Sequence, residues 1–210
     1  MSDLPRRSAR GDETARALIA AARTLWATRG FAGASVRDVA AAAGVNSALV
    51  RYHFGSKLGL YKAVIDEALG RLGSSILEAV QGGDTLAERA ERSLDAYFRY
   101  LTEHHEVARL IQRGLIDGDP AVSEPVMAHM QPLVQTIAAT VPLDAETPFG
   151  RLGDVVITLF AASVTPAIHA PMVAELLGDD LRDPVVVERR RAHLRTLLRM
   201  AVEHLPAPTA

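Results

Sequence analysis

The sequence predicts an all-α protein, and three features of its 210 residues lead to that prediction. Apolar residues recur at helical spacing along most of the chain, and no segment alternates apolar with polar residues over a useful strand length. Breaks between these segments are short and rich in Gly, Asp and Pro, as in DGDP at 117–120 and GDDLRDP at 178–184. Hydrophobic residues make up 49% of the chain, which suffices for a sizeable core.

The first helices are predicted from caps and stop signals. Residues 1–11 form a basic arm that we expect to be flexible, and an amphipathic helix over 12–29 ends at Gly30. Ser35, with Asp38 three residues later, has the spacing of a capping box at the start of a short helix. Gly44 ends that helix, and Asn46 caps a second short helix over about 46–54.

The same signals place the later helices. Thr85 with Glu88 repeats the capping-box spacing, and Pro132 predicts a kink or a break in the helix around it. Thr147 is the expected N-cap of the next helix, with Pro148 at its first position, and Asp183 with Pro184 opens the last one. The predicted ranges are about 56–80, 85–102, 106–115, 123–139, 149–169 and 184–204.

Two short helices joined by a turn that contains Gly form the helix-turn-helix pattern. In the second helix, Leu49, Val50 and Phe54 define the buried side, and the opposite side carries small residues followed by cationic and hydrogen-bonding ones. Such a side suits insertion into the major groove of DNA. The candidate DNA-contact residues are Ser35, Arg37, Asn46, Ser47, Ala48, Arg51, Tyr52, His53 and Lys57.

Lys57 and Arg51 have different expected roles in that contact. Lys57 lies in the first turn of a long helix, where the backbone N–H groups already favour an anion, so we expect it to contact a phosphate. Arg51 lies midway along the second short helix, and its guanidinium matches the O6 and N7 acceptors of guanine. Tyr52 and His53 can donate to phosphates, or one of them can pack inward beside Phe54.

The stretch from about 17 to about 69 resembles the DNA-binding domain of the TetR family of transcriptional regulators. The resemblance consists of the leading helix LIAAARTLWATRGF, the turn AGVN, the YHF triplet at 52–54 and the SK pair at 56–57, in that order. Many family members have an aromatic residue where this chain has Arg51. The resemblance implies a three-helix DNA-binding domain over 12–57, followed by a helical ligand-binding and dimerisation domain over 58–210.

The charge distribution agrees with a head that faces a polyanion. The whole chain has a net charge of only −2, but residues 1–60 carry nine Lys and Arg against four Asp and Glu. Residues 61–210 carry fourteen against twenty-one. Such asymmetry between two parts of a chain is typical of a nucleic-acid-binding segment joined to a body that does not face the nucleic acid.

The sequence gives little support to other classes of protein. It contains no cysteine, which is compatible with the cytoplasm, and it has no nucleophile elbow, P-loop or dinucleotide-binding motif. We therefore expect no enzyme activity, catalytic residues, cofactor or metal. Residues 155–174 are uncharged over the length of a membrane span, but they include hydroxyl groups, His169 and two prolines. We interpret them as a buried core or interface helix without membrane contact.

The predicted function is ligand-responsive transcriptional regulation, with a repressor released from its double-stranded DNA operator by a small-molecule effector. A pocket and a homodimer are implied by the resemblance. The candidate pocket residues mix apolar area with a few polar groups: Tyr97, Phe98, Arg113, Met127, Met130 and His169. The dimer is expected through the helices over about 149–169 and 184–204, because their small and apolar residues would otherwise expose a large patch.

One alternative stays open at this stage. An all-α enzyme or small-molecule-binding protein could carry a vestigial helix-turn-helix head. Ligand uptake or turnover without DNA binding would distinguish it from a regulator.

Overall fold

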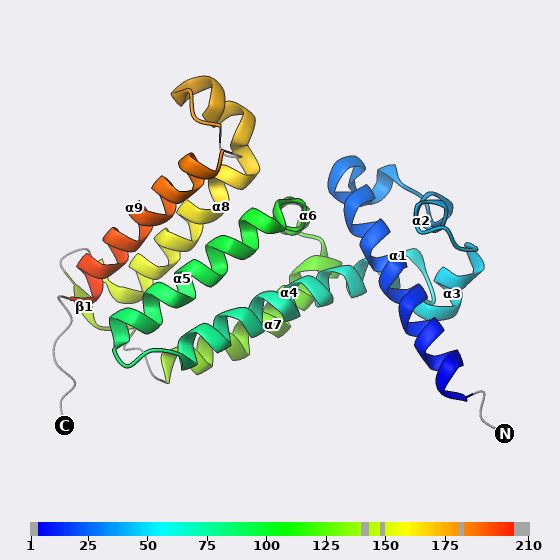
Figure 1. Ribbon diagram of the computed structural model, residues 1–210, viewed down its shortest axis with the longest axis horizontal. Helices are drawn as coiled ribbons and strands as arrows, with labels where there is room; N and C mark the ends of the chain where they lie inside the picture. The colour runs from blue at the N-terminus through cyan, green and yellow to red at the C-terminus, as the bar shows by residue number, and fades with distance from the viewer. Residues whose placement is uncertain (1–3, 140–142, 148–149, 181–182, 204–210) are drawn as a thin grey trace. The chain divides into compact units, whose positions relative to one another are not determined.

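The computed structural model describes residues 4–139, 143–147, 150–180 and 183–203, and almost all of them are helical (Figure 1). The all-α prediction is confirmed. A two-residue antiparallel ribbon, with Glu146 opposite Arg151, is the one exception among these residues. The elements are α1 (Leu4–Gly33), α2 (Val36–Ala42), α3 (Ala48–Phe54), α4 (Lys57–Gln81), α5 (Leu86–Glu103), α6 (His105–Ile116), α7 (Pro120–Ala138), β1 (Glu146–Thr147), β2 (Gly150–Arg151), α8 (Leu152–Leu177) and α9 (Pro184–Val202).

The chain forms two compact units. The first unit contains the residues up to Gly70 together with Arg109–Ala128, and the second contains Arg71–Ala108 and the residues from His129 onward. The boundaries between the units fall inside α4, α6 and α7. The first unit therefore extends past the expected domain boundary at residue 57, and it includes a segment that the sequence had placed in the body.

The core of the first unit is built around Trp26, which is 1% exposed. Its indole Nε1 donates to the carbonyl of Ala34 at 3.3 Å, which satisfies the polar end of a buried ring. Phe31 and Tyr61 pack against it, with ring centroids 4.5 to 5.5 Å apart. Burial, together with nearby Asp119 and Asp117, raises the pKa of Tyr61 to about 12. The aromatic cluster fixes the end of α1 against the start of α4.

Close contacts explain why residues 109–128 belong to the first unit. A Cβ on Gly114 would lie 2.3 Å from Val122 Cγ2, so α6 and α7 approach each other at a position where only glycine fits. Lys62 of α4 forms an ion pair with Glu124 of α7 at 3.0 Å. The Arg113 guanidinium lies against Gly30, where α1 is interrupted by a φ of +73°.

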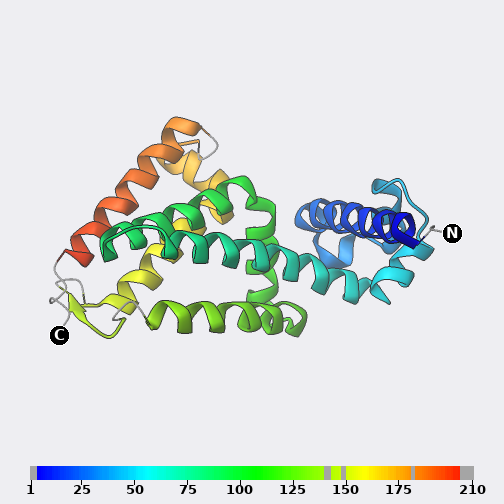
Figure 2. The same ribbon diagram turned by 60° about the horizontal axis from the view of Figure 1, so that its bottom comes forward.

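In the second unit, α8 and α9 pack against each other and both pack against α5 (Figure 2). Their shared core consists of Leu94, Phe98, Leu152, Leu159, Leu194, Leu198 and Val202. A second cluster joins α4, α5 and α7 through Leu72, Ile76, Tyr100 and Leu133. Leu194, Leu198 and Ala201 lie in the helix through which the dimer was expected, but they are buried within one chain.

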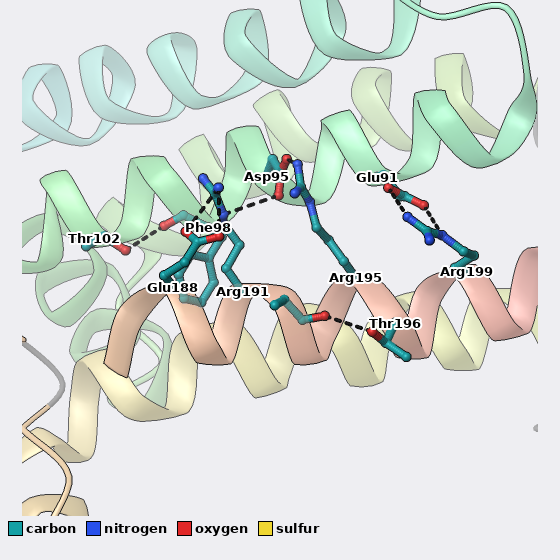
Figure 3. Close-up of polar contacts among 10 residues, drawn as sticks. Glu91, Asp95, Phe98, Thr102, Glu188, Arg191, Arg195, Thr196 and Arg199 are labelled. Carbon is teal, nitrogen blue, oxygen red and sulfur yellow. Dashed lines mark hydrogen bonds and ion pairs between the residues drawn. The ribbon is translucent and has the colours of Figure 1, made fainter. Parts of the chain in front are cut away.

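A ladder of ion pairs holds α9 against α5 (Figure 3). Arg199 contacts Glu91 in a two-bond arrangement, with Nε–Oε1 at 2.7 Å and Nη2–Oε2 at 3.0 Å. This contact raises the pKa of the Arg199 guanidinium. Arg195 donates to Asp95, and Arg191 lies 3.9 Å from the same carboxylate. We call these five residues the α5–α9 ladder.

Three local expectations need correction. Residues 4–11, expected as part of a flexible arm, belong to α1; Pro5 lies in the first turn, where proline is tolerated. The kink or break predicted at Pro132 is not found, and α7 is continuous. Pro132 has no backbone N–H to donate to the carbonyl of Ala128, but Ala128 is exposed, so water can take the place of that hydrogen bond. Thr147 belongs to β1, and Arg151 is the N-cap of α8.

Two remaining expectations concern α8. Pro148 lies outside the described residues. The helix runs past the expected end at residue 169 to Leu177, with non-helical angles at His169 itself. Within the described residues, no helix combines the length and the apolar character needed to cross a bilayer.

Candidate functional site

The helix-turn-helix is held together by its own caps. The Ser35 hydroxyl accepts from Asp38 N at 3.2 Å, and Ser35 N donates to Asp38 Oδ2 at 2.7 Å, so the predicted capping box is formed. The hydrogen bonds from Ser35 hold the pKa of the Asp38 carboxyl below its ordinary value. Ser35 is exposed, but its side chain serves first to start α2.

The turn that follows α2 is equally well defined. Gly44 has a φ of +67°, and Val45 N donates to the carbonyl of Ala40 at 2.9 Å, which closes the end of α2. Asn46 Oδ1 accepts from Ala48 N at 2.8 Å and so binds the first residue of α3, but the N-cap position itself is held by Ser47 and not by Asn46 as predicted. Val50 then anchors α3 in the core with 1% exposure. These local bonds fix the angle at which α3 leaves the turn.

The side of α3 that faces away from this core is open. On α3, Tyr52 is 80% exposed and Ala48 and Arg51 are also exposed, and Arg37 is exposed on α2. A small residue near the start of α3 with an arginine and a tyrosine beyond it can approach base edges and phosphates in a major groove. We call these four residues the recognition face.

The structure gives other surroundings to three of the predicted contact residues. Ser47 is half-buried at the N-cap of α3. His53 is half-buried beside Gly11 of α1, where a Cβ would lie 3.7 Å from its Cε1. The Lys57 ammonium donates to the carbonyl of Phe31 at 2.5 Å and lies 4.5 Å from the centre of the Phe31 ring. Lys57 therefore links the end of α1 to the start of α4.

The second unit contains an apolar cavity of about 70 Å³ among α4, α5, α8 and α9. Its lining is aliphatic apart from one aromatic ring, one hydroxyl and one guanidinium: Ile76, Val80, Leu86, Arg89, Ala90, Ser93, Leu94, Leu143, Val156, Leu159, Phe160 and Leu198. Arg89, Ser93 and Tyr97 follow at four-residue intervals on one face of α5. Tyr97 packs edge-on against Phe160, with ring centroids 4.3 Å apart.

The six candidate pocket residues do not converge on this cavity. Tyr97 backs its Phe160 wall, Met130 packs beside Tyr97 in the neighbouring cluster, and Phe98 is buried in the α5–α8–α9 core. Met127 and Arg113 are exposed in the first unit, and His169 is exposed at the irregular turn of α8. The polar groups that line the cavity are Arg89 and Ser93, which were not predicted from the sequence. Their four-residue spacing from Tyr97 on α5 was the signal that could have found them.

Taken together, the first unit is a helix-turn-helix module with an exposed cationic recognition face, and the second is a helical body with an apolar cavity. This combination is typical of a DNA-binding transcriptional regulator. Residues 18–64 match the family described as bacterial regulatory proteins, tetR family. The helix-turn-helix part of this chain is thus a DNA-binding domain of the tetR type.

Known proteins similar to this chain include regulators of opposite effect. The HTH-type transcriptional activator FasR of Mycolicibacterium smegmatis is 26% identical over 164 residues, which cover 78% of this chain and 73% of FasR. The HTH-type transcriptional repressor Rv3405c of Mycobacterium tuberculosis is 37% identical over 109 residues, and the match spans 52% of this chain and 50% of that protein. A TetR family regulator structure from Marinobacter aquaeolei covers 94% of this chain and 98% of its own, with a TM-score of 0.68 at 18% identity.

Proposed function

We propose that this protein is a homodimeric repressor that leaves its double-stranded DNA operator when a small molecule occupies the apolar cavity. The observation that carries the proposal is the recognition face, a cationic and hydrogen-bonding surface of α2 and α3, with α3 anchored in the core through Val50. Repression is the simpler outcome of operator binding, because a bound dimer blocks the DNA it covers and needs no further contact surface.

Within the recognition face, Arg51 is the proposed base-reading residue. It is exposed midway along α3, and the caps at Ser35 and Asn46 hold the helix that presents it. Arg37 and Tyr52 are proposed to contact the DNA backbone. Lys57 can still offer its remaining N–H groups to a phosphate while it holds Phe31.

The test is DNA binding by Arg51→Ala, measured by fluorescence anisotropy on operator and scrambled duplexes at two salt concentrations. The operator is first located by footprinting the purified protein on its own upstream region. We expect Arg51→Ala to cost about 1–3 kcal/mol on the operator and to change scrambled-duplex affinity little, because a base contact is lost.

The matched control is Arg99→Ala, which removes an equal charge from an exposed position on α5. It should leave both affinities unchanged. Equal losses on both duplexes for Arg51→Ala would assign Arg51 to the DNA backbone, and the absence of any protected upstream segment would contradict the proposed function.

The dimer is proposed through the outward faces of α8 and α9. After Leu194, Leu198 and Ala201 are assigned to the core, Ile157 is 68% exposed, Met200 42% and Leu197 38%, and Ala161 is also exposed. We call Ile157, Ala161, Leu197 and Met200 the α8–α9 face. A second copy that covers it removes apolar surface from water and supplies the second recognition face that a two-fold operator requires.

A regulator rather than an enzyme is the function that the cavity favours. Its described lining offers one guanidinium and one hydroxyl, and the hydroxyl of Ser93 already donates to the carbonyl of Arg89 at 2.7 Å. This lining contains no pair of a nucleophile and a base. As a DNA-binding regulator, the protein is proposed to act in the cytoplasm.

A further inference from the structure

We propose that the cavity in the second unit binds an aliphatic monocarboxylate, with its hydrocarbon body among the leucines and its carboxylate held by Arg89. The proposal rests on the ligand-responsive function proposed above and names the chemical class of the effector.

The cavity wall selects for an aliphatic body. Helix α5 contributes Leu86, Ala90 and Leu94, and the facing residues from α4, α8 and α9 are Ile76, Val80, Val156, Leu159 and Leu198. The single aromatic side chain in the lining, Phe160, is packed against Tyr97, so it offers one ring rather than a stacking slot. Burial of apolar ligand surface against such a wall supplies affinity without directional contacts.

Arg89 provides the polar end of the site. Its Nε donates to the carbonyl of Gly83 at 3.0 Å, which fixes the plane of the guanidinium at the end of the cavity near the α4–α5 loop. Among the described residues, no carboxylate forms an ion pair with Arg89, whereas Arg191, Arg195 and Arg199 of the α5–α9 ladder all have one. The two terminal nitrogens of Arg89 therefore remain available for a planar anion.

The charge of the site favours a carboxylate over other head groups. A half-buried guanidinium is always protonated, so a neutral ligand would leave its charge uncompensated beside an apolar body. A phosphate monoester would bring nearly two negative charges to a described lining with only one cation. One carboxylate matches one guanidinium in charge and in its two-bond geometry.

Ser93 extends the same polar strip. Its hydroxyl proton is given to the carbonyl of Arg89 at 2.7 Å, which leaves its oxygen to accept rather than donate. A carboxylate cannot receive a hydrogen bond from this oxygen and is repelled by it. The carboxylate therefore stays at Arg89, one turn away, instead of entering deeper into the cavity. Tyr97, the next residue on this face, has its pKa raised by burial and stays neutral behind Phe160.

The experiment measures binding of three probes to the full-length protein by isothermal titration calorimetry: butanoate, butan-1-ol and butyl phosphate. Their short alkyl chain suits a cavity of about 70 Å³. We expect saturable binding of butanoate that is at least tenfold tighter than binding of the alcohol or the phosphate. Arg89→Gln should weaken butanoate binding at least tenfold and leave butan-1-ol binding unchanged, which also shows that the variant is folded. Arg99→Gln, an exposed change on the same helix, should bind butanoate like the unaltered protein.

Several results would overturn the proposal. They are no binding of butanoate, equal binding of butanoate and butan-1-ol, tighter binding of butyl phosphate, or unchanged butanoate binding by Arg89→Gln. If Arg89→Gln also loses butan-1-ol binding, Arg89→Lys is measured. Restored butanoate binding by Arg89→Lys supports the proposed contact, and no restoration rejects it.

The same samples separate this proposal from the proposed function. Operator binding without butanoate binding would reject the carboxylate site and leave DNA recognition standing. Butanoate binding without release of the operator would support the carboxylate site and reject ligand-responsive control.

Discussion

At the level of single residues, Lys57 combines a structural contact, which could not be predicted from the sequence, with a proposed DNA contact. Its ammonium binds the carbonyl of Phe31 and lies over the ring of the same residue, so it fastens α1 to α4. A charged donor at the end of α1 also complements the negative end of that helix. The remaining N–H groups of Lys57 are the proposed phosphate contact. Both the stability of the fold and the affinity for DNA would then depend on this one side chain.

We predict that Lys57→Ala lowers the free energy of unfolding by about 1.5 kcal/mol, because a charge-assisted hydrogen bond is lost. Thermal unfolding monitored by circular dichroism checks this. Lys62→Ala is the control, since its pair with Glu124 is exposed and should contribute less than about 1 kcal/mol. The salt dependence of DNA binding should fall by about one ion for Lys57→Ala. A lowered unfolding temperature with an unchanged salt slope would leave Lys57 a purely structural role.

Asp38 is a second residue whose effect depends on its surroundings. Its folded-state pKa lies below the ordinary 3.8 because Ser35 donates to the carboxylate from its side chain and backbone. The ionised form therefore stabilises α2 at pH values above 3.8, and this contribution disappears as the pH falls through the lower folded-state value.

We predict that Asp38→Asn has a lower unfolding temperature than the unaltered protein at pH 7. The difference should shrink as the pH is lowered below 3.8, because both proteins then carry an uncharged side chain at this position. Differential scanning calorimetry over this pH range measures it, with the exposed Asp12→Asn as control. A difference that stays constant down to the lowest pH would show that the charge of Asp38 is unimportant.

At the scale of elements, the α5–α9 ladder decides which face of α9 is turned inward. The charged residues on α9 follow at four-residue spacing, so they share one stripe, and Glu91 and Asp95 have the same spacing on α5. Asp95 and Glu91 are both 18% exposed, but Asp95 faces two arginines that are 33% and 36% exposed, whereas Arg199 opposite Glu91 is 56% exposed. The two rungs should therefore differ in their contribution to stability.

We predict that Asp95→Ala destabilises the protein by about 2 kcal/mol, because two partly buried guanidinium groups lose their shared partner. Glu91→Ala should cost less than about 1 kcal/mol, since water reaches the Arg199 side of that pair. Urea unfolding of both variants provides the measurement. The order would be contradicted by a larger loss for Glu91→Ala. Full restoration of Asp95→Ala by Arg195→Leu would support the charge-based explanation.

At the scale of the whole molecule, the ladder turns one side of α9 inward and leaves the α8–α9 face exposed as one apolar surface of these two helices. Packing of that face against a second copy is what would bring two recognition faces to one operator. The boundaries between the two units fall inside α4, α6 and α7. These three helices therefore connect the second unit, which carries the α8–α9 face, to the first unit, which carries the recognition face.

We predict a dimeric mass by multi-angle light scattering at micromolar concentration. Leu197→Glu should shift the protein toward monomers and weaken operator binding at least tenfold, because a charge would be buried at the interface. Leu176→Glu serves as the control, since it changes an exposed leucine of α8 outside the proposed face. A dimer that survives Leu197→Glu, or a monomer before any substitution, would contradict this interface.

The sequence by itself determined the parts of this protein that depend on neighbours within a few residues. The capping boxes at Ser35 and Thr85, the Gly44 turn and the Asp183 cap formed as predicted, because each requires atoms less than one helical turn apart. The predicted cap at Asn46 is displaced by one residue, since Ser47 is the N-cap of α3. Periodic apolar stripes likewise predicted the helices to within a few residues for most elements. The TetR-like order of these local signals agrees with the match of residues 18–64 to the tetR family of bacterial regulatory proteins.

The tertiary structure alone decided which partner each side chain meets. Arg195 and Asp95 lie 100 positions apart, and Lys57 and Phe31 lie 26 apart, so no local pattern pairs them. Leu194 and Leu198 looked as suitable for a dimer as for a core, because burial depends on which helix arrives opposite. The cavity has the same origin: its lining comes from four helices and the Leu143 segment, and only their packing leaves Arg89 without a carboxylate among the described residues.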